Sequence, residues 1–180
     1  MSNGAPSFNG TSSYLQIPSD DFSTYPISGS TTTAFSASFG VWFKISSARV
    51  ILGQTDGGEP PSDPGGYVPA LYVDTEGNLR ASLFYHGGAD QIITASAYND
   101  NNWHLAVDTF ANETETLYVD GLIANSQQVE EIGYKSSYTC FLGTGHTTSD
   151  WPAANGAWFY FDGALDEINV SNVARSSDWV

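Results

Sequence analysis

The sequence predicts an all-β fold, an antiparallel β-sandwich of two stacked sheets. Helical periodicity is nearly absent from its 180 residues. Hydrophobic and polar side chains instead alternate over several short stretches, which is the period-two pattern of half-buried strands. Turn-forming sequences such as Asp56-Gly57-Gly58 and Asp120-Gly121 separate these stretches. Many strands with regular turns and no intervening helices are typical of a β-sandwich.

The strongest alternation covers residues 35–45, where every second side chain is hydrophobic. It predicts a long strand with one face in the core, and Trp42 falls on the opposite face among small residues. A second alternation begins at Trp103, and we expect Trp103 to plug the core on the same face as Leu105 and Val107. Further strands are predicted at 14–17, 49–55, 68–74, 79–85, 91–97, 117–119, 138–143, 158–161 and 164–170.

Turns and caps complete the predicted elements. Asp120-Gly121 suits a tight hairpin turn with positive φ. The one candidate helical turn lies at 174–179, where Ser176 or Ser177 could cap it. Regular helix therefore contributes almost nothing to the predicted fold.

Composition and charge narrow the range of functions. The 5 Lys and Arg residues against 20 Asp and Glu residues give a net charge of −15. The chain has no basic patch that could displace counterions from a nucleic acid, and its charge argues against docking on anionic lipid. No apolar run approaches the roughly 18 residues of a membrane span, and the polar residues 1–10 do not read as a signal peptide. Without repeats or linkers, residues 1–180 are expected to form a single domain.

Five sequence blocks follow one another along the chain in a recognisable order. They are 8–18, 35–46 with Trp-Phe-Lys, 102–107 (Asn-Trp-His-Leu-Ala-Val), 117–121 (Leu-Tyr-Val-Asp-Gly) and 161–176 with Gly-Ala-Leu-Asp-Glu-Ile. Together they resemble the laminin-G-like jelly-roll modules of the concanavalin A-like lectin and glucanase superfamily. The resemblance implies two large antiparallel sheets, one of them curved, packed face to face. A fold alone does not give a function.

Relatives in this superfamily include glycoside hydrolases, which need two carboxyl groups flanking the scissile bond. The candidate acid pairs lie in a turn (Asp74, Glu76), at a hairpin tip (Glu113, Glu115) or on opposite faces of a strand (Asp166, Glu167). We therefore expect no acid pair on the inner face of a strand, and we predict that the chain is not an enzyme. His86, His104 and His146 are too far apart for a zinc motif. Cys140 stands alone, so we expect a buried thiol without a disulfide.

Calcium is the metal that the sequence favours, because it takes its ligands from carboxylates, carbonyls and water. In many relatives the Asp of the Leu-Asp-Glu-Ile strand supplies a ligand, and the resemblance gives this role to Asp166. The alternative is that Asp166 accepts a hydrogen bond from a neighbouring backbone amide. A second possible calcium site, at the rim, comprises Asp56, Glu59 and Asp63, which could also simply solvate their loop.

Sugar recognition needs an aromatic platform with polar groups around it. Trp42 has the geometry for stacking on a sugar ring, unless a neighbouring strand or loop shields it. The long loops 56–67 and 143–156 are expected to line a shallow cleft at one rim. The other candidate ligand-binding residues are Tyr67 and Trp151 in these loops, and Tyr85, His86 and Asp90 around one turn.

These features predict a non-catalytic recognition or adhesion module that binds glycan or a protein surface. We expect calcium to stabilise it, and we expect it outside cells, on a cell surface or on a virion. The acidic surface suits salty surroundings, where charge repulsion is screened. One alternative is a purely structural decoration or spacer domain of a surface or phage assembly. Another is a divergent glycan hydrolase or lyase.

Overall fold

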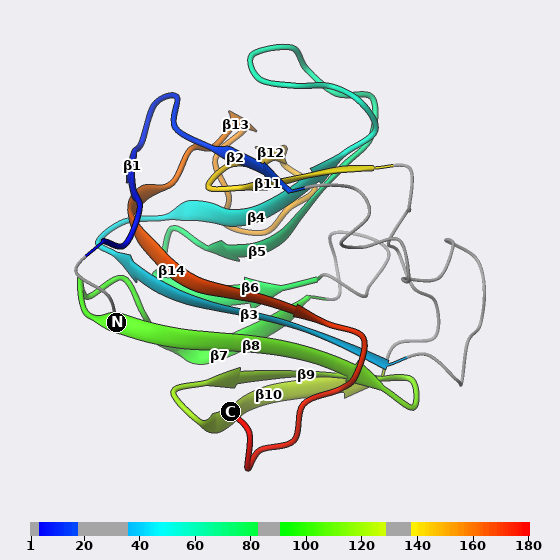
Figure 1. The fold of residues 1–180 in the computed structure, drawn as a ribbon. Coiled ribbons are helices and arrows are strands. Elements are labelled where there is room, and N and C mark those ends of the chain that lie inside the picture. Colours follow the sequence, from blue (N-terminus) through cyan, green and yellow to red (C-terminus); the bar gives the residue numbers. More distant parts are fainter. Residues whose placement is uncertain (1–3, 18–35, 83–90, 129–137) are drawn as a thin grey trace.

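The structure is a computed structural model that describes residues 4–17, 36–82, 91–128 and 138–180. Within these ranges the chain forms fourteen strands and no helix. Twelve of the strands build two six-stranded sheets, which Figure 1 shows stacked face to face. Every strand pairing is antiparallel, so the structure confirms the predicted sandwich.

The first sheet has the strand order β1-β14-β3-β8-β9-β10. Its strands are β1 (Ser7–Asn9), β14 (Asp162–Ser171), β3 (Ser36–Ile45), β8 (Trp103–Ala111), β9 (Thr114–Val119) and β10 (Leu122–Gln128). The second sheet has the order β2-β11-β4-β5-β6-β7. Its strands are β2 (Leu15–Ile17), β11 (Thr139–Leu142), β4 (Arg49–Thr55), β5 (Tyr67–Val73), β6 (Asn78–Ala81) and β7 (Ile92–Ala97). The short strands β12 (His146–Thr147) and β13 (Ala157–Trp158) form a separate pair.

The main core fills the space between the two large sheets. On β3 the alternate residues from Ala37 to Ile45 are at most 1% exposed, as their period-two pattern predicts. Side chains of the second sheet, such as Ile51 and Val73, complete this cluster. Burying one side chain of this size stabilises the fold by about 1.5–3 kcal/mol. Cys140 lies in the same cluster as a free buried thiol, as expected.

The predicted face of β8 is wrong. Lys44 lies opposite Trp103 in the sheet register, and Trp42 lies opposite Leu105. Paired residues on neighbouring strands point to the same face. Because Trp42 and Lys44 point away from the core, Trp103 and Leu105 do so as well. Trp103 therefore does not plug the core, and Phe110 fills that role from the other face of β8.

A second hydrophobic cluster covers the opposite face of the second sheet. Trp151 and Phe159 pack there against Val50 and Tyr72. The covering segment lies close to β4 because Gly53 has no side chain, and a Cβ at that position would lie 2.5 Å from the Gly145 Cα. The segment from 143 to 161 is therefore a packed layer and not an open loop.

The predicted strand at 158–161 is shorter in the structure, because β13 ends at Trp158. Beyond it, the backbone N–H groups of Phe159 and Phe161 donate to the Gly145 and Gly143 carbonyls, each over 2.9 Å. The residues of the predicted strand 79–85 that follow Ser82 lie outside the described residues.

The turns follow their sequences closely, with one difference. Asp120 and Gly121 have φ angles of 52° and 81°, which confirms the predicted tight hairpin turn. The expected helical turn near the C-terminus is a single turn, in which Trp179 and Val180 donate to the Ser176 carbonyl. None of the described residues belongs to a helix that could cross a membrane.

Candidate ligand-binding surface

The outer face of the first sheet, which is turned away from the second sheet, carries side chains in regular rows. The register of β8, β3 and β14 sets the rows, because residues directly opposite one another share a face. The row made of Trp103, Lys44 and Ala164 is followed by the row made of Leu105, Trp42 and Asp166, and then by the row made of Val107, Gly40 and Asn169. This face therefore combines aromatic, apolar and polar groups along one direction.

A cleft of about 230 Å³ opens over the second and third rows. Trp42 and Trp179 contribute aromatic side chains to its lining, and Gly40 contributes a position without a side chain. The remaining lining residues are Leu105, Val107, Glu167 and Asn169. An apolar cleft with a few polar groups is the usual form of a small-molecule site. We call it the Trp42 cleft.

Trp179 reaches the Trp42 cleft from the last residues of the chain, which Figure 1 shows in red after β14. The Arg175 guanidinium lies 4.5 Å from the centre of the Trp179 ring, a cation–π contact. Ser38 on β3 anchors the segment, because its hydroxyl donates to the Val173 carbonyl and accepts from the Arg175 N–H. Trp179 remains 46% exposed, so its ring is accessible to a ligand.

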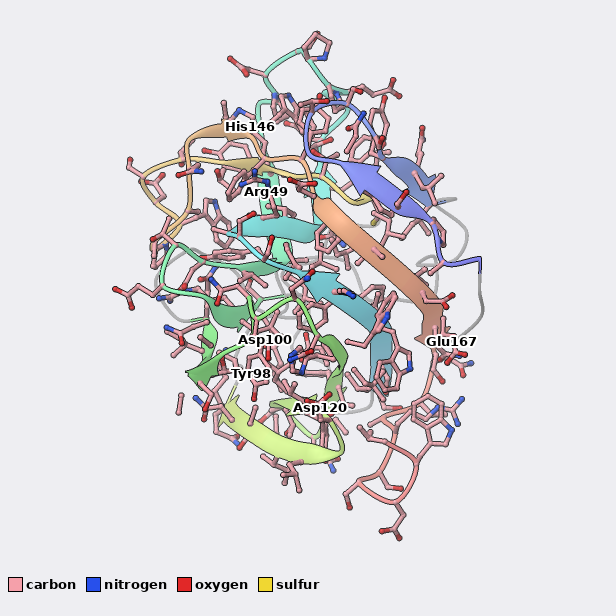
Figure 2. All side chains as sticks on the ribbon, turned by 90° about the vertical axis from the view of Figure 1, so that its left-hand side faces the viewer. Arg49, Tyr98, Asp100, Asp120, His146 and Glu167 are labelled. Atoms are coloured by element: carbon pink, nitrogen blue, oxygen red, sulfur yellow. The ribbon has the colours of Figure 1, made fainter. Side chains whose placement is uncertain are left out.

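The polar groups of the cleft lie at an irregularity of β14. The pairing of β14 with β3 shifts register between Asp166 and Asn169. Glu167 lies inside this bulge with φ of 49°, a left-handed conformation that is uncommon for a residue with a side chain. Bulges often change the direction of a side chain next to a functional site. Figure 2 shows Glu167 beside β14, far from Arg49 and His146.

A second and larger depression, of about 430 Å³, adjoins the first row on the same face. Trp103, Lys44 and Asn101 line it together with Asp162. We call it the Trp103 depression. The remaining lining residues are Ser7, Phe8, Gly163 and Ala164.

Of the residues that the sequence suggested for ligand binding, the three that the structure describes, Trp42, Tyr67 and Trp151, do not line a common cleft. Trp42 lines the cleft described above. Trp151 does not point into a rim cleft as expected, because it is only 5% exposed and fills the second hydrophobic cluster. Tyr85, His86 and Asp90 lie outside the described residues.

Tyr67 lies where the two long loops meet, but the loops close on each other instead of lining a cleft. Its hydroxyl donates to Thr148 over 2.8 Å, and its ring packs against His146 at 4.6 Å between ring centres. The Trp158 indole N–H donates to the Ser62 carbonyl over 2.9 Å. Tyr67 is thus engaged in holding the two loops together.

His104 joins three segments at one end of the sandwich. Its Nδ1 lies 2.7 Å from an Asp120 carboxylate oxygen, and its Nε2 lies 3.0 Å from Asp100. Burial acts to lower the pKa of His104, but the hydrogen bonds and charges of the two carboxylates outweigh it and raise the pKa above its usual value. Hydrogen bonds from the Asn102 backbone and side chain, and then from His104, lower the pKa of Asp100 to about 2. Figure 2 shows Tyr98, Asp100 and Asp120 close together at this point.

The structure contradicts the expectation that no acid pair lies on the inner face of a strand. Asp108 on β8 and Glu115 on β9 both point inward and are 2% and 0% exposed. Burial, followed by the charge of Glu115, raises the pKa of Asp108 well above its usual value. The Gln127 side chain donates to Glu115 over 3.2 Å. Glu115 was placed at a hairpin tip from its sequence, but the positive φ residues Asn112 and Glu113 end the turn before it.

Asp166 makes the backbone hydrogen bond that was the alternative to a calcium-binding role. One of its oxygens accepts the backbone N–H of Glu167 over 3.0 Å, and the other is buried and has no hydrogen-bond partner among the described residues. Within the described ranges, no three His, Cys, Asp or Glu side chains gather as a metal site would need. Calcium can also bind carbonyls and water. Calcium binding at Asp166 therefore stays a prediction.

Three cleft residues were not predicted from the sequence, namely Trp179, Glu167 and Asn169. Trp179 follows the last strand, and its sequence neighbours give no sign that it folds back onto β8. Glu167 and Asn169 follow Asp166 in a regular strand pattern, which does not reveal the bulge. The register of β3 with β8 would have placed Trp103 and Lys44 on the same face as Trp42.

The fold and these clefts define a two-sheet β-sandwich domain with an aromatic-lined outer face. The family model described as the concanavalin A-like lectin/glucanases superfamily (Laminin_G_3) matches residues 9–180. The chain therefore belongs to this family, as its sequence blocks indicated. A comparison with the curated proteins found no match.

Solved structures share the fold at low sequence identity. Domain 4 of AbnA, an extracellular arabinanase from Geobacillus stearothermophilus solved with arabinotriose, has a TM-score of 0.56 and 12% identity over 97% of this chain and 73% of that chain. The IT-sialidase CBM40 of Ruminococcus gnavus has a TM-score of 0.55 and 13% identity over 97% of this chain and 91% of that chain. Domains LG4-5 of the mouse laminin alpha1 chain have a TM-score of 0.54 and 15% identity over 99% of this chain and 45% of that chain. Identities this low show the fold alone.

Proposed function

We propose that this chain is a non-catalytic module that binds glycans through the Trp42 cleft. The observation that carries the proposal is the pair of indole rings, Trp42 and Trp179, lining one cleft beside Glu167 and Asn169. Indole faces stack on the apolar faces of sugar rings, while carboxylate and amide groups bond the hydroxyls. The arabinanase domain solved with arabinotriose supports a sugar as the ligand class.

A non-catalytic role is supported by the position of the acid pair. Asp108 and Glu115 lie between the two sheets and are almost completely buried. Hydrolysis requires two carboxyl groups on either side of a bound glycosidic bond. A sugar could not reach this pair without opening the core. We expect no release of reducing sugar from neutral or acidic polysaccharides.

The proposal includes a location outside the cell, on a cell surface or on a virion. An extracellular arabinanase and a laminin chain among the solved structures with this fold support an extracellular setting. The net charge of −15 supports surroundings in which salt screens repulsion.

A glycan array followed by calorimetry on the captured sugar tests the proposed site. Trp179→Ala removes an exposed ring from the cleft, and Trp42→Ala removes its counterpart on β3. Each should weaken binding about tenfold or more, the usual effect of truncating an aromatic residue at the centre of a site. Leu122→Ala is the matched control, because Leu122 on β10 is 73% exposed and does not line the cleft.

The outcomes separate the candidate functions. Binding that is lost in both Trp variants and kept in Leu122→Ala supports the proposal. Binding that survives both Trp variants places the sugar elsewhere on the molecule and contradicts the site. An array with no bound glycan contradicts the glycan-binding function and leaves two alternatives, recognition of a protein surface and a structural spacer.

A further inference from the structure

The Trp42 cleft and the Trp103 depression lie next to each other along the same strands. Lys44 and Trp42 are two residues apart on β3, and their partners Trp103 and Leu105 are two residues apart on β8. Two residues of an antiparallel strand span about 7 Å. The two hollows are therefore neighbouring positions on one face, and each contains an indole ring.

The Trp103 depression differs from the cleft in its charged groups. Lys44 contributes an ammonium group there, with Asp162 and Asn101 beside it. The backbone fixes Asn101 in a left-handed conformation with φ of 63°, and its N–H donates to the Ile45 carbonyl over 2.8 Å. The Trp42 cleft contains Glu167 instead, and Asp166 lies directly opposite Trp42 in the same row.

The Lys44 side chain is unusual because it has no partner among the described residues, in a chain with a fourfold excess of acids. In the part of the chain that the structure describes, the three arginines are all engaged. Arg80 pairs with Asp74 at 2.7 Å, Arg49 lies over Phe159, and Arg175 lies over Trp179. The Lys44 side chain makes no ion pair or hydrogen bond with any described residue, although 20 carboxylates are available in the sequence. Its ammonium group is free to bind an anion.

We propose that the Trp103 depression is a second subsite, which binds a sugar residue carrying an anionic group through Lys44. This inference rests on the proposed glycan-binding function. The ligand is then an oligosaccharide of at least two residues that runs along β3 and β8. Its uncharged residue stacks in the Trp42 cleft, where Asp166 and Glu167 repel an anion. Its acidic residue lies at Trp103, where Lys44 donates a charge-assisted hydrogen bond and offsets the one carboxylate of the lining, Asp162.

Two kinds of anionic group on a sugar fit this subsite, the carboxylate of a uronic acid and a sulfate ester. Polygalacturonate and a sulfated galactan serve as the two acidic probes. Carboxyl-reduced polygalacturonate and desulfated galactan are their matched neutral forms, since each differs only in the anionic group. Affinity electrophoresis at fixed salt compares the wild-type protein with Lys44→Gln, Lys44→Arg and Leu122→Ala.

We expect the wild-type protein to bind at least one acidic probe about tenfold more tightly than its neutral form, because a hydrogen bond to a charged group contributes this much. Lys44→Gln should abolish the preference, while Lys44→Arg and Leu122→Ala retain it. Trp103→Ala should weaken binding of the acidic probe more than that of the neutral form.

Three results would overturn the second subsite. One is equal or weaker binding of both acidic probes relative to their neutral forms. Another is an acid preference that survives Lys44→Gln. The third is binding of neutral glycans on the array with neither acidic probe bound, which leaves the Trp42 cleft intact as a site. If no glycan of any kind binds, the proposed function fails together with the subsite.

Discussion

At the scale of single residues, the titratable groups inside the sandwich have the most distinct environments. Asp74 is fully buried, accepts the backbone N–H groups of Glu76 and Asn78, and pairs with Arg80. It fixes the turn that its sequence predicted. Asp108 is also buried, but it lies beside a second carboxyl group, Glu115, and has no cation to pair with among the described residues. The two carboxyl groups therefore contribute to stability with opposite signs.

His104→Gln should make stability less dependent on pH. The folded pKa of His104 is raised, so the protonated imidazole stabilises the fold below the unfolded value of about 6.5. This contribution is lost as pH rises through the folded pKa. A partly exposed ion pair contributes about 1 kcal/mol to the free energy of unfolding. Urea unfolding at pH 5.5 should show the variant less stable by about that amount, and the difference should shrink by pH 9. A constant difference at both pH values would contradict the ion-pair role.

Asp108→Asn should stabilise the protein at neutral pH. The raised folded pKa of Asp108 means that the native state holds a proton that the unfolded chain releases above about pH 3.9. Stability of the wild-type protein therefore falls as pH rises above that value. The amide carries no charge, and it can still donate to Glu115. We expect the variant to gain about 1–3 kcal/mol relative to the wild-type protein between pH 4 and 7.

The control for this prediction is Asp150→Asn, because Asp150 is exposed. It should leave the pH dependence of unfolding unchanged. A destabilised Asp108→Asn variant at pH 7 would show that the carboxylate has a favourable partner in the folded protein.

At the scale of elements, sequence patterns predicted strands well and sheet faces less well. The pattern of β3 is unambiguous, because apolar residues fill its inner face, whereas its outer face carries small or polar residues apart from Trp42. On β8 the two faces are harder to tell apart. The outer face includes the apolar and buried Val107, and the inner face includes the polar Asp108. Period two then identifies a strand but not its orientation. Only the register with β3 decides which face of β8 is buried.

The candidate site was predicted only at Trp42, for a related reason. The cleft depends on the bulge at Glu167 and on the C-terminal segment that places Trp179 beside residues of β3 and β8. Both features arise from contacts between distant parts of the chain. Trp151 was predicted to lie in an exposed loop at the rim, because the surrounding residues are turn-forming. Packing of Trp151 and Phe159 on Val50 overrides that local composition.

Gly53→Ala tests how closely the covering segment approaches β4. A Cβ at Gly53 would lie 2.5 Å from the Gly145 Cα and 2.6 Å from the Thr144 carbonyl oxygen, and backbone atoms cannot move aside cheaply. We expect a loss of about 1–3 kcal/mol in the free energy of unfolding. Gly156→Ala in the same segment is the control, since nothing lies within 4 Å of its added Cβ. Equal stability of the two variants would contradict the close packing.

At the scale of the whole molecule, the net charge of −15 influences stability and association. Repulsion among like charges destabilises the compact state and weakens as salt screens it. Calcium at Asp166 would act in addition to this general effect. Thermal melts therefore need a comparison in which ionic strength is held constant.

Melting with calcium and with a chelator, at equal ionic strength, tests the predicted metal. A ligand that binds only the native state raises the melting temperature, and the stabilisation grows with the logarithm of one plus the ratio of the free ligand concentration to Kd. If Asp166 is a ligand, calcium should raise the melting temperature of the wild-type protein and not that of Asp166→Asn. An unchanged melting temperature in the wild-type protein would count against calcium.

The uneven distribution of tryptophan provides an optical measure of occupancy. Three of the five indoles, Trp42, Trp103 and Trp179, line the outer-face hollows, while Trp151 is sealed in the second cluster and Trp158 lies at the loop junction. Intrinsic fluorescence should consequently report a bound sugar without any attached dye. Quenching by iodide, compared before and after titration, would reveal which emitters the ligand shields.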